Sequence, residues 1–160
     1  MTPVLIALGS NLGDRALNLR RALGEMDQAV RIVRLSAVWE TDPIDAPAGS
    51  GAFLNMVAVG WTEHSAPVLL ERLHAIEESM GRQRRVRNQP RIIDLDLILH
   101  GVTIIRSRAL SVPHPRYLTR GFVLAPFSEL GLAWSDPASG RFLPSRVADY
   151  GGVRRLGPLY

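Results

Sequence analysis

The spacing of apolar residues switches between the periods of a strand and a helix along the chain, which restricts the fold to a mixture of both. Val4–Leu8 is a continuous apolar run that stops at a glycine, and it predicts a buried strand. Asp14 is a candidate N-cap for a helix whose apolar face contains Ala16, Leu19, Leu23 and Met26. Alternation over Val33–Trp39 then predicts a second strand.

The next part of the chain shows the order strand, helix, strand. Phe53–Trp61 predicts the first strand, and Ser65 is a candidate N-cap for a helix that ends at Gly81. Ile92–Leu99 predicts the closing strand. The order β-α-β-β-α-β is typical of a ferredoxin-like α+β sandwich, in which a mainly antiparallel sheet carries helices on one face.

The remaining segments add peripheral elements to this arrangement. His100-Gly101 before Val102–Ile105 predicts a hairpin turn, Phe122–Leu130 predicts a helix, and Ser145 is a candidate cap for a short C-terminal helix. Because no repeat or linker interrupts the pattern, we expect residues 1–160 to form a single domain.

Composition excludes several kinds of site. All 19 basic residues are arginine, so a P-loop, which requires lysine, is excluded, and the absence of cysteine excludes disulfides and thiolate metal sites. No apolar run approaches the roughly 20 residues that span a bilayer, and Met1–Leu8 lacks the features of a secretory signal. We therefore expect a cytoplasmic protein with no membrane association.

Two carboxylates share one face of the last predicted core strand. Ile93, Leu95, Leu97 and Leu99 should point one way and Asp94 and Asp96 the other, because side chains alternate along a strand. Two such charges repel, and cations would relieve that repulsion. Oxygen ligands without histidine or cysteine favour magnesium at a phosphoryl-transfer site. The alternative is a solvated strand face with incidental charges.

A cluster of arginines precedes this strand. Five of them lie within ten residues: Arg82, Arg84, Arg85, Arg87 and Arg91. Magnesium polyphosphates need both carboxylates for the metal and guanidinium groups for the remaining oxygens, so the combination favours nucleotide binding. Taken alone, the cluster favours a solvated surface or a nucleic-acid patch.

Four segments in order along the chain resemble the hydroxymethyl-dihydropterin pyrophosphokinase family. They are Ala7–Gly13, Phe53–Asn55, Arg87–Ile98 and Val112–Leu124, and the resemblance extends over about Val4–Leu130. The match is imperfect, since Asn88, Gln89, Ala109 and Pro115 stand where the family usually has other residues.

The resemblance implies a role for each matching residue. It implies that Asp94 and Asp96 bind two magnesium ions and that Arg82 and Arg91 are catalytic. It implies ATP contacts from Arg84, Leu97, His114 and Arg120. It implies a pterin pocket formed by Thr41, Pro43, Ile44, Phe53, Asn55 and Phe122.

The implied reaction is transfer of pyrophosphate from ATP to the hydroxymethyl group of 6-hydroxymethyl-7,8-dihydropterin, with release of AMP, in folate biosynthesis. The expected partners are these two small molecules, with no nucleic acid and no membrane, and the expected state is a monomer. Two alternatives stay open. The chain could be an inactive nucleotide-binding protein or, less favoured because acidic residues would repel a phosphate backbone, an RNA-binding module.

Overall fold

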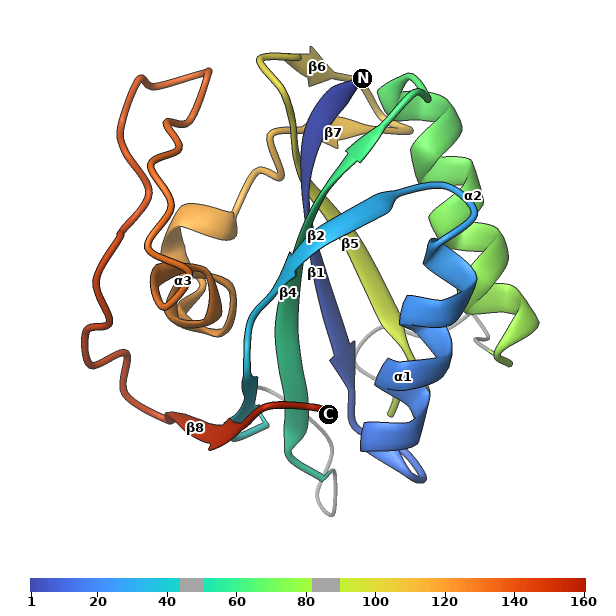
Figure 1. Ribbon diagram of the computed structural model, residues 1–160, viewed down its shortest axis with the longest axis vertical. Coiled ribbons are helices and arrows are strands. Elements are labelled where there is room, and N and C mark those ends of the chain that lie inside the picture. Colours follow the sequence, from blue (N-terminus) through green and yellow to red (C-terminus); the bar gives the residue numbers. More distant parts are fainter. Residues whose placement is uncertain (44–50, 82–89) are drawn as a thin grey trace.

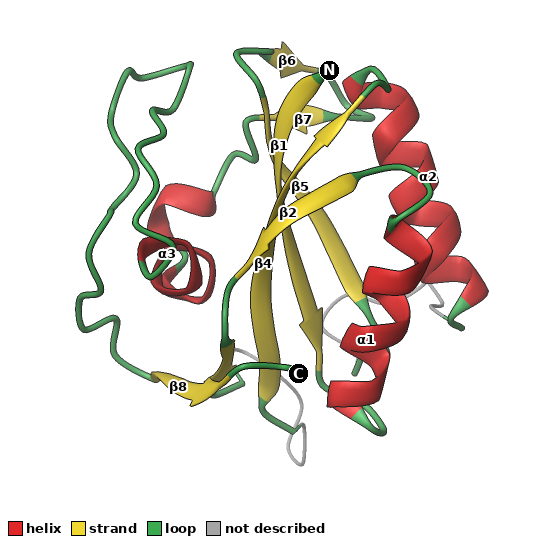
Figure 2. Cartoon of the chain, in the orientation of Figure 1, coloured by secondary structure: helices red, strands yellow, loops and turns green. Residues whose placement is uncertain are grey.

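The computed structural model describes residues 1–43, 51–81 and 90–160 of the chain. Expectations that fall on residues 44–50 and 82–89 lie outside this described part. The elements in chain order are β1 (Thr2–Ser10), α1 (Arg15–Met26), β2 (Arg31–Leu35), β3 (Val38–Thr41), β4 (Phe53–Thr62), α2 (Ala66–Ser79), β5 (Asp94–His100), β6 (Ile105–Arg106), β7 (Ser111–Val112), a 3-10 turn (Tyr117–Thr119), α3 (Gly121–Ser128) and β8 (Val153–Gly157) (Figures 1 and 2).

One antiparallel sheet organises the fold. Its strand order is β5-β1-β4-β3-β8, and β2 also pairs with β4. The first and last strands of the β-α-β-β-α-β unit, β1 and β5, therefore lie beside each other, and β1 also pairs with β4, which is likewise far from it in sequence. This topology confirms the predicted ferredoxin-like α+β fold.

The sheet separates two hydrophobic cores. Helices α1 and α2 cover one face, while α3 lies against the other (Figure 1). Neighbouring residues of β1 enter different cores, Ile6 the one under α1 and α2 and Leu5 the one under α3, because side chains alternate along a strand. The prediction placed helices on one face, and the structure adds α3 on the opposite face.

Both predicted N-cap residues stand at helix starts, but only Asp14 makes a capping hydrogen bond with its side chain. The side chain of Asp14 accepts a hydrogen bond from the backbone N–H of Leu17 at 3.1 Å, as an N-cap does. Ser65 occupies the N-cap position of α2, but its hydroxyl makes no capping bond. Pro67 in the first turn of α2 supplies the fixed φ angle that favours a helix start.

The strand predicted at Val33–Trp39 is divided into β2 and β3. Between them, the hydroxyl of Ser36 accepts a hydrogen bond from the N–H of Val57 at 2.9 Å, and the N–H of Ser36 donates to the carbonyl of Val57 at 3.0 Å. The N–H of Ala37 donates to Glu129. Between β2 and β3, side-chain oxygens of Ser36 and Glu129 thus accept backbone hydrogen bonds in place of strand carbonyls. The alternating sequence pattern alone does not show this.

Two predictions for the C-terminal half are wrong. The turn at Gly101, where φ is +54°, leads into β6, and the hairpin pairs β6 with β7 instead of pairing Val102–Ile105 with β5. No helix follows Ser145 in the described residues; the chain instead forms β8 along β3. Gly151-Gly152 disfavours a helix there, and long-range pairing decides the outcome. Among the described helices, none is long and apolar enough to cross a membrane.

Candidate active site

The two aspartates lie on the sheet face that carries α3. On β5, Asp94 is opposite Gly9 of β1 and Asp96 is opposite Ala7, which belongs to the α3-side core. Ile93, Leu95 and Leu97 pack into the other core, so the predicted division of the strand is observed at these positions. The side chains of Asp94 and Asp96 are 22% and 32% exposed, and both are therefore accessible to a ligand.

Leu99 departs from this alternation. It lies in the α3-side core with Ile98, because the pairing of β1 with β5 shifts between Leu5 and Ile6. An extra residue on one strand reverses the faces beyond it. The prediction that Leu99 shares a face with Leu97 is therefore wrong.

The edge position of β5 is stabilised from α2. The carboxylate of Glu77, whose residue is 0% exposed, accepts a hydrogen bond from the backbone N–H of Leu95 at 2.7 Å. This contact fixes the backbone between Asp94 and Asp96 in place. Sequence patterns gave no signal for it, because it depends on how α2 packs along the sheet edge.

Asn11 positions Arg91 at the entrance to β5. The backbone N–H of Asn11 donates to the carbonyl of Arg91 at 3.0 Å, and the N–H of Arg91 donates to Oδ1 of Asn11. The guanidinium of Arg91 then contacts Oδ2 of Asp94 at 2.9 Å. Asn11 is 8% exposed and is not among the predicted site residues, although it lies within the resembling segment Ala7–Gly13.

A second arginine approaches the other aspartate. Arg120, directly before α3, places Nη1 at 3.7 Å from Oδ2 of Asp96, and its guanidinium lies 5.4 Å from the ring centroid of Phe122. Each aspartate thus has its own arginine. A polyanion bound here would meet two guanidinium groups and two carboxylates that can share cations with it.

His114 lies beside the same strand. Its backbone N–H donates to the carbonyl of Ile98 at 2.9 Å, and its Nδ1 accepts from the N–H of Arg116 at 3.2 Å. Burial, together with the charges of Arg120 and Arg116, lowers the pKa of His114 to about 4. The imidazole is therefore neutral at pH 7 and carries its proton on Nε2, which leaves a hydrogen-bond donor.

We predict that the His114 imidazole titrates near pH 4 in NMR spectra of the free protein. Because folding lowers its pKa from 6.5, the unfolded chain binds more protons between these values, and the free energy of unfolding should rise with pH from about 4 to 6.5. In His114→Asn this part of the pH dependence should disappear from urea unfolding curves. An imidazole that titrates near 6.5 in the native protein would contradict the assignment.

The predicted pterin residues meet at the neighbouring strands. Nδ2 of Asn55 donates to Oγ1 of Thr41 at 2.6 Å, and both residues are 6% exposed. Gly9 lies between Asn55 on β4 and Asp94 on β5 in one row across the sheet. A Cβ at Gly9 would lie 3.1 Å from Oδ1 of Asn55 and 3.5 Å from the Phe53 ring. The absence of a side chain at Gly9 therefore leaves space for the side chains of Asn55 and Phe53.

We predict that Gly9→Ala raises KM for the pterin substrate about tenfold while the dissociation constant of MgATP changes little, because the added methyl crowds Asn55 and Phe53. Steady-state kinetics with each substrate varied would measure this. Gly24→Ala is the control, since a Cβ at Gly24 meets nothing within 4 Å. An equal rise in both constants would argue against crowding at Asn55.

The remaining predicted site residues either lie outside the described residues or are not on the sheet face of the aspartates. Ile44, Arg82 and Arg84 fall outside the described residues. Pro43 is exposed at the end of β3. Leu97 is 3% exposed in the core under α1 and α2, on the face away from the aspartates, so only its backbone could contact an adenine.

The donor set suits magnesium better than a metal held only by protein. In the described part of the chain, no group of three or more histidine, cysteine, aspartate or glutamate side chains comes together as a metal site. Asp94 and Asp96 offer oxygen atoms only. Magnesium commonly uses one or two carboxylates and takes its remaining ligands from water and substrate phosphates. The residues present therefore fit magnesium bound together with a nucleotide.

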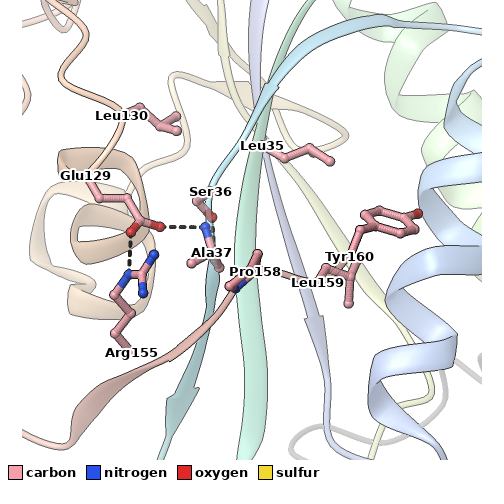
Figure 3. A pocket seen from close by; sticks show the side chains of 9 residues that line it. All are labelled: Leu35, Ser36, Ala37, Glu129, Leu130, Arg155, Pro158, Leu159 and Tyr160. Atoms are coloured by element: carbon pink, nitrogen blue, oxygen red, sulfur yellow. Dashed lines mark hydrogen bonds and ion pairs between the residues drawn. The ribbon is translucent and has the colours of Figure 1, made fainter.

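The cavities help to locate the site only in part. A cavity of about 340 Å³ lies between α3 and the C-terminal residues, where Glu129 accepts hydrogen bonds from Ala37 and Arg155 (Figure 3). None of the predicted site residues line it. A smaller cavity of about 160 Å³ includes His114 in its wall but neither Asp94 nor Asp96.

Comparison with known sequences gives consistent matches. The sequence model of 7,8-dihydro-6-hydroxymethylpterin-pyrophosphokinase (HPPK) matches residues 5–131. The 2-amino-4-hydroxy-6-hydroxymethyldihydropteridine pyrophosphokinase of Bacillus subtilis is 43% identical, over 78% of this chain and 75% of that protein. The protein of the same name from Pseudomonas aeruginosa is 36% identical over 96% of both chains.

Longer proteins also match. The chain is 41% identical to a mitochondrial folate synthesis bifunctional protein of Arabidopsis thaliana, of which it covers 23%. The crystal structure of Plasmodium falciparum HPPK-DHPS has the same fold, with a TM-score of 0.62 at 16% identity over 77% of this chain and 39% of that one. The sequence and the fold together show that the chain belongs to the 7,8-dihydro-6-hydroxymethylpterin-pyrophosphokinase family.

Proposed function

We propose that this chain transfers a pyrophosphoryl group from ATP to 6-hydroxymethyl-7,8-dihydropterin in folate biosynthesis. The observation that supports the proposal is the row Asp94, Gly9 and Asn55 across three adjacent strands, in which a candidate metal ligand and a candidate pterin ligand are separated by one glycine. The names of the relatives support the same reaction.

In this proposal the hydroxymethyl oxygen attacks the β-phosphorus of ATP. The bond between that phosphorus and the oxygen it shares with the α-phosphate breaks, AMP leaves, and the hydroxyl proton passes to solvent. Asp94 and Asp96 would hold two magnesium ions, which neutralise phosphate charge and orient the phosphate oxygens. No covalent enzyme intermediate is needed, so positioning and charge stabilisation supply most of the rate.

The arginines and His114 act on the nucleotide. Arg91 is held by Asn11 and aligned with Asp94, so its guanidinium is preorganised before substrate binds. Arg120 occupies the equivalent position beside Asp96. Neutral His114 supplies an Nε2–H donor for a phosphate oxygen. Arg82 and Arg84 join this set in our proposal as the catalytic and ATP-binding arginines of the preceding segment, and Leu97 contributes its backbone to adenine.

The pterin end uses different chemistry. The amide of Asn55 offers both a donor and an acceptor to a heterocycle edge, with Thr41 fixing one amide hydrogen. Phe53 and Phe122 supply aromatic surface on the same face of the sheet. Pro43 and Ile44 complete the pocket in this proposal.

Several broader features belong to the same proposal. We take residues 1–160 as one catalytic unit, supported by the pairing of β8 with β3 in the central sheet, and we expect a cytoplasmic monomer. The RNA-binding alternative is not favoured, because the sheet face presents Asp94 and Asp96 beside its candidate ligand site. An inactive nucleotide-binding protein would have little reason to keep the paired arginines.

The identity of the nucleotide product tests the proposal. In ³¹P NMR spectra of the protein with MgATP and hydroxymethyl-dihydropterin, we expect AMP and a pterin diphosphate to accumulate in equal amounts. Accumulation of ADP with a pterin monophosphate would show transfer of a single phosphoryl group and overturn the proposed reaction.

A further inference from the structure

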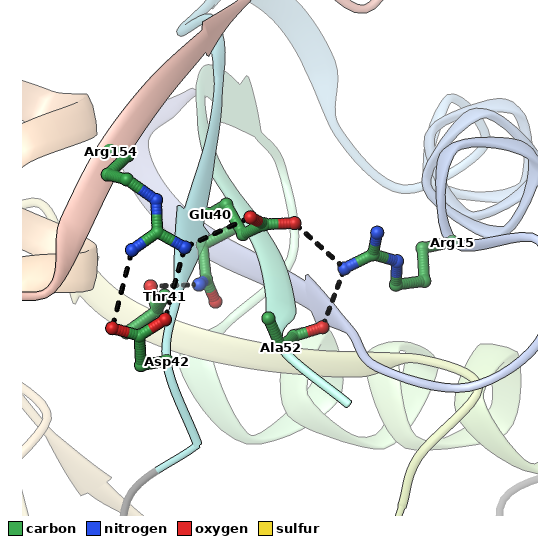
Figure 4. A network of polar contacts seen from close by, with 7 residues as sticks. Arg15, Glu40, Thr41, Asp42, Ala52 and Arg154 are labelled. Atoms are coloured by element: carbon green, nitrogen blue, oxygen red, sulfur yellow. Dashed lines mark hydrogen bonds and ion pairs between the residues drawn. The ribbon is translucent and has the colours of Figure 1, made fainter. Parts of the chain in front are cut away.

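A network of charged side chains joins α1, β3 and β8 (Figure 4). Arg154 on β8 donates to Glu40 at 3.0 Å and to the two carboxylate oxygens of Asp42 at 3.1 and 3.3 Å. Arg15, the first residue of α1, donates to the other oxygen of Glu40 at 3.2 Å and to the carbonyl of Ala52 at 2.7 Å. Arg15 therefore connects Glu40 on β3 with the residue before β4.

The network reinforces a backbone ladder. In the pairing of β3 with β8, Glu40 is opposite Arg154 and Thr41 is opposite Val153. The N–H of Asp42 donates to the carbonyl of Gly152 at 3.2 Å, which extends the contact past the end of β3. The backbone on both sides of Thr41 is thus held from β8.

The ion pairs of Arg154 orient the side chains of Glu40 and Asp42 more than they stabilise the folded protein. The side chain of Arg154 is 51% exposed and that of Glu40 is 23% exposed, and ion pairs at such sites contribute little to folding. The hydrogen bond from Arg154 lowers the pKa of Glu40, so the carboxylate is ionised at neutral pH. Because Arg154 contacts two carboxylates at once, its planar guanidinium fixes their relative positions.

Thr41 connects the part of β3 that is held by β8 with Asn55 on the sheet face that carries the aspartates. Its side chain alternates with those of Glu40 and Asp42, and its Oγ1 accepts from Nδ2 of Asn55 at 2.6 Å. In this arrangement the Nδ2 end of the amide faces Thr41, and the Oδ1 end lies on the side of Gly9. The donor and acceptor pattern that Asn55 offers to a ligand therefore depends on where Thr41 is held.

We propose that Arg154 and Glu40 are positioning residues for the pterin end of the active site, acting through Thr41 on Asn55. The inference rests on the proposed function and adds to it, because β8 lies outside residues 5–131 that match the family. In this proposal the C-terminal strand β8 contributes to pterin recognition by holding Thr41 in place.

Arg154→Ala tests the inference. We expect KM for the pterin, and its dissociation constant from equilibrium titration, to rise about three- to tenfold. Turnover and KM for MgATP should change less than twofold. Glu40→Gln should act in the same direction, and Arg154→Lys should recover part of the loss.

Arg155→Ala is the matched control. Arg155 is the next residue on β8, its side chain is 53% exposed, and it pairs with Glu129 at 2.8 Å, away from Thr41. It should leave pterin binding unchanged. Because Arg154 and Glu40 act as one pair, the double variant Glu40→Gln/Arg154→Ala should be no worse than the weaker-binding single variant.

Three results would overturn the inference. They are a pterin dissociation constant for Arg154→Ala equal to that of Arg155→Ala, additive losses in the double variant, and a rise in both substrate constants that follows the loss in the urea unfolding midpoint. If the wild-type protein binds no pterin at all, the proposed function fails and takes this inference with it. The two failures are therefore distinguishable in the wild-type titration.

Discussion

Asp96→Asn is expected to lower kcat/KM for AMP formation by about 10²–10³-fold, the usual effect of removing one preorganised electrostatic group from an active site. The substitution keeps the size of the side chain but removes the negative charge next to Arg120. It should therefore weaken the magnesium-dependent part of ATP binding, which a titration of nucleotide at several magnesium concentrations measures. Asp94→Asn should behave in the same way at the Arg91 side.

The control for the aspartates is Asp27→Asn, an exposed aspartate at the C-terminal end of α1, which should leave activity unchanged. Urea unfolding of each variant separates lost chemistry from lost stability, and we expect only small changes because the two aspartates are partly exposed. Nucleotide binding by Asp96→Asn that depends on magnesium as in the wild-type protein would remove Asp96 from the metal site.

Arg91→Ala is expected to lower kcat by about 10²–10³-fold while the dissociation constant of MgATP rises only a few-fold. Asn11 holds the Arg91 backbone, so the guanidinium is placed in advance for charge that develops during transfer. An interaction that is stronger in the transition state than in the ground state affects turnover more than binding. Single-turnover kinetics at saturating substrates would separate the two effects.

Arg91→Lys keeps the charge but loses the planar fork, so we expect it to recover only part of the activity. Arg72→Ala, an exposed arginine on α2, is the matched control and should be neutral. The opposite pattern for Arg91→Ala, with weak MgATP binding and normal single-turnover rates, would assign Arg91 to ground-state binding alone.

The core of the fold could be predicted because hydrophobic period is a local signal. The apolar runs Val4–Leu8 and Ile92–Leu99 predict strands, and the structure pairs the corresponding strands β1 and β5 directly. What failed depends on contacts distant in sequence. The division of Val33–Trp39 requires Val57 and Glu129, and β8 requires β3 as its partner. Only the three-dimensional arrangement brings these groups together.

The candidate site likewise contains residues that a local sequence pattern predicts and residues that depend on contacts distant in sequence. Alternation placed Asp94 and Asp96 on one face, and that placement is observed. The supporting contacts of Asn11 and Glu77 could not be predicted, although Asn11 lies in the resembling segment Ala7–Gly13, because each residue acts on a backbone group that only the fold brings near. The link from Arg154 to Glu40 joins residues far apart in sequence and could not be predicted.

The central claim, that one site joins magnesium nucleotide and pterin chemistry, is tested most directly by AMP formation from ATP by the purified protein. The rate should require hydroxymethyl-dihydropterin and magnesium together, and it should vanish when EDTA removes the metal. No AMP under the complete conditions, from a protein that still binds MgATP, would contradict the claim and leave a nucleotide-binding protein without this catalytic activity.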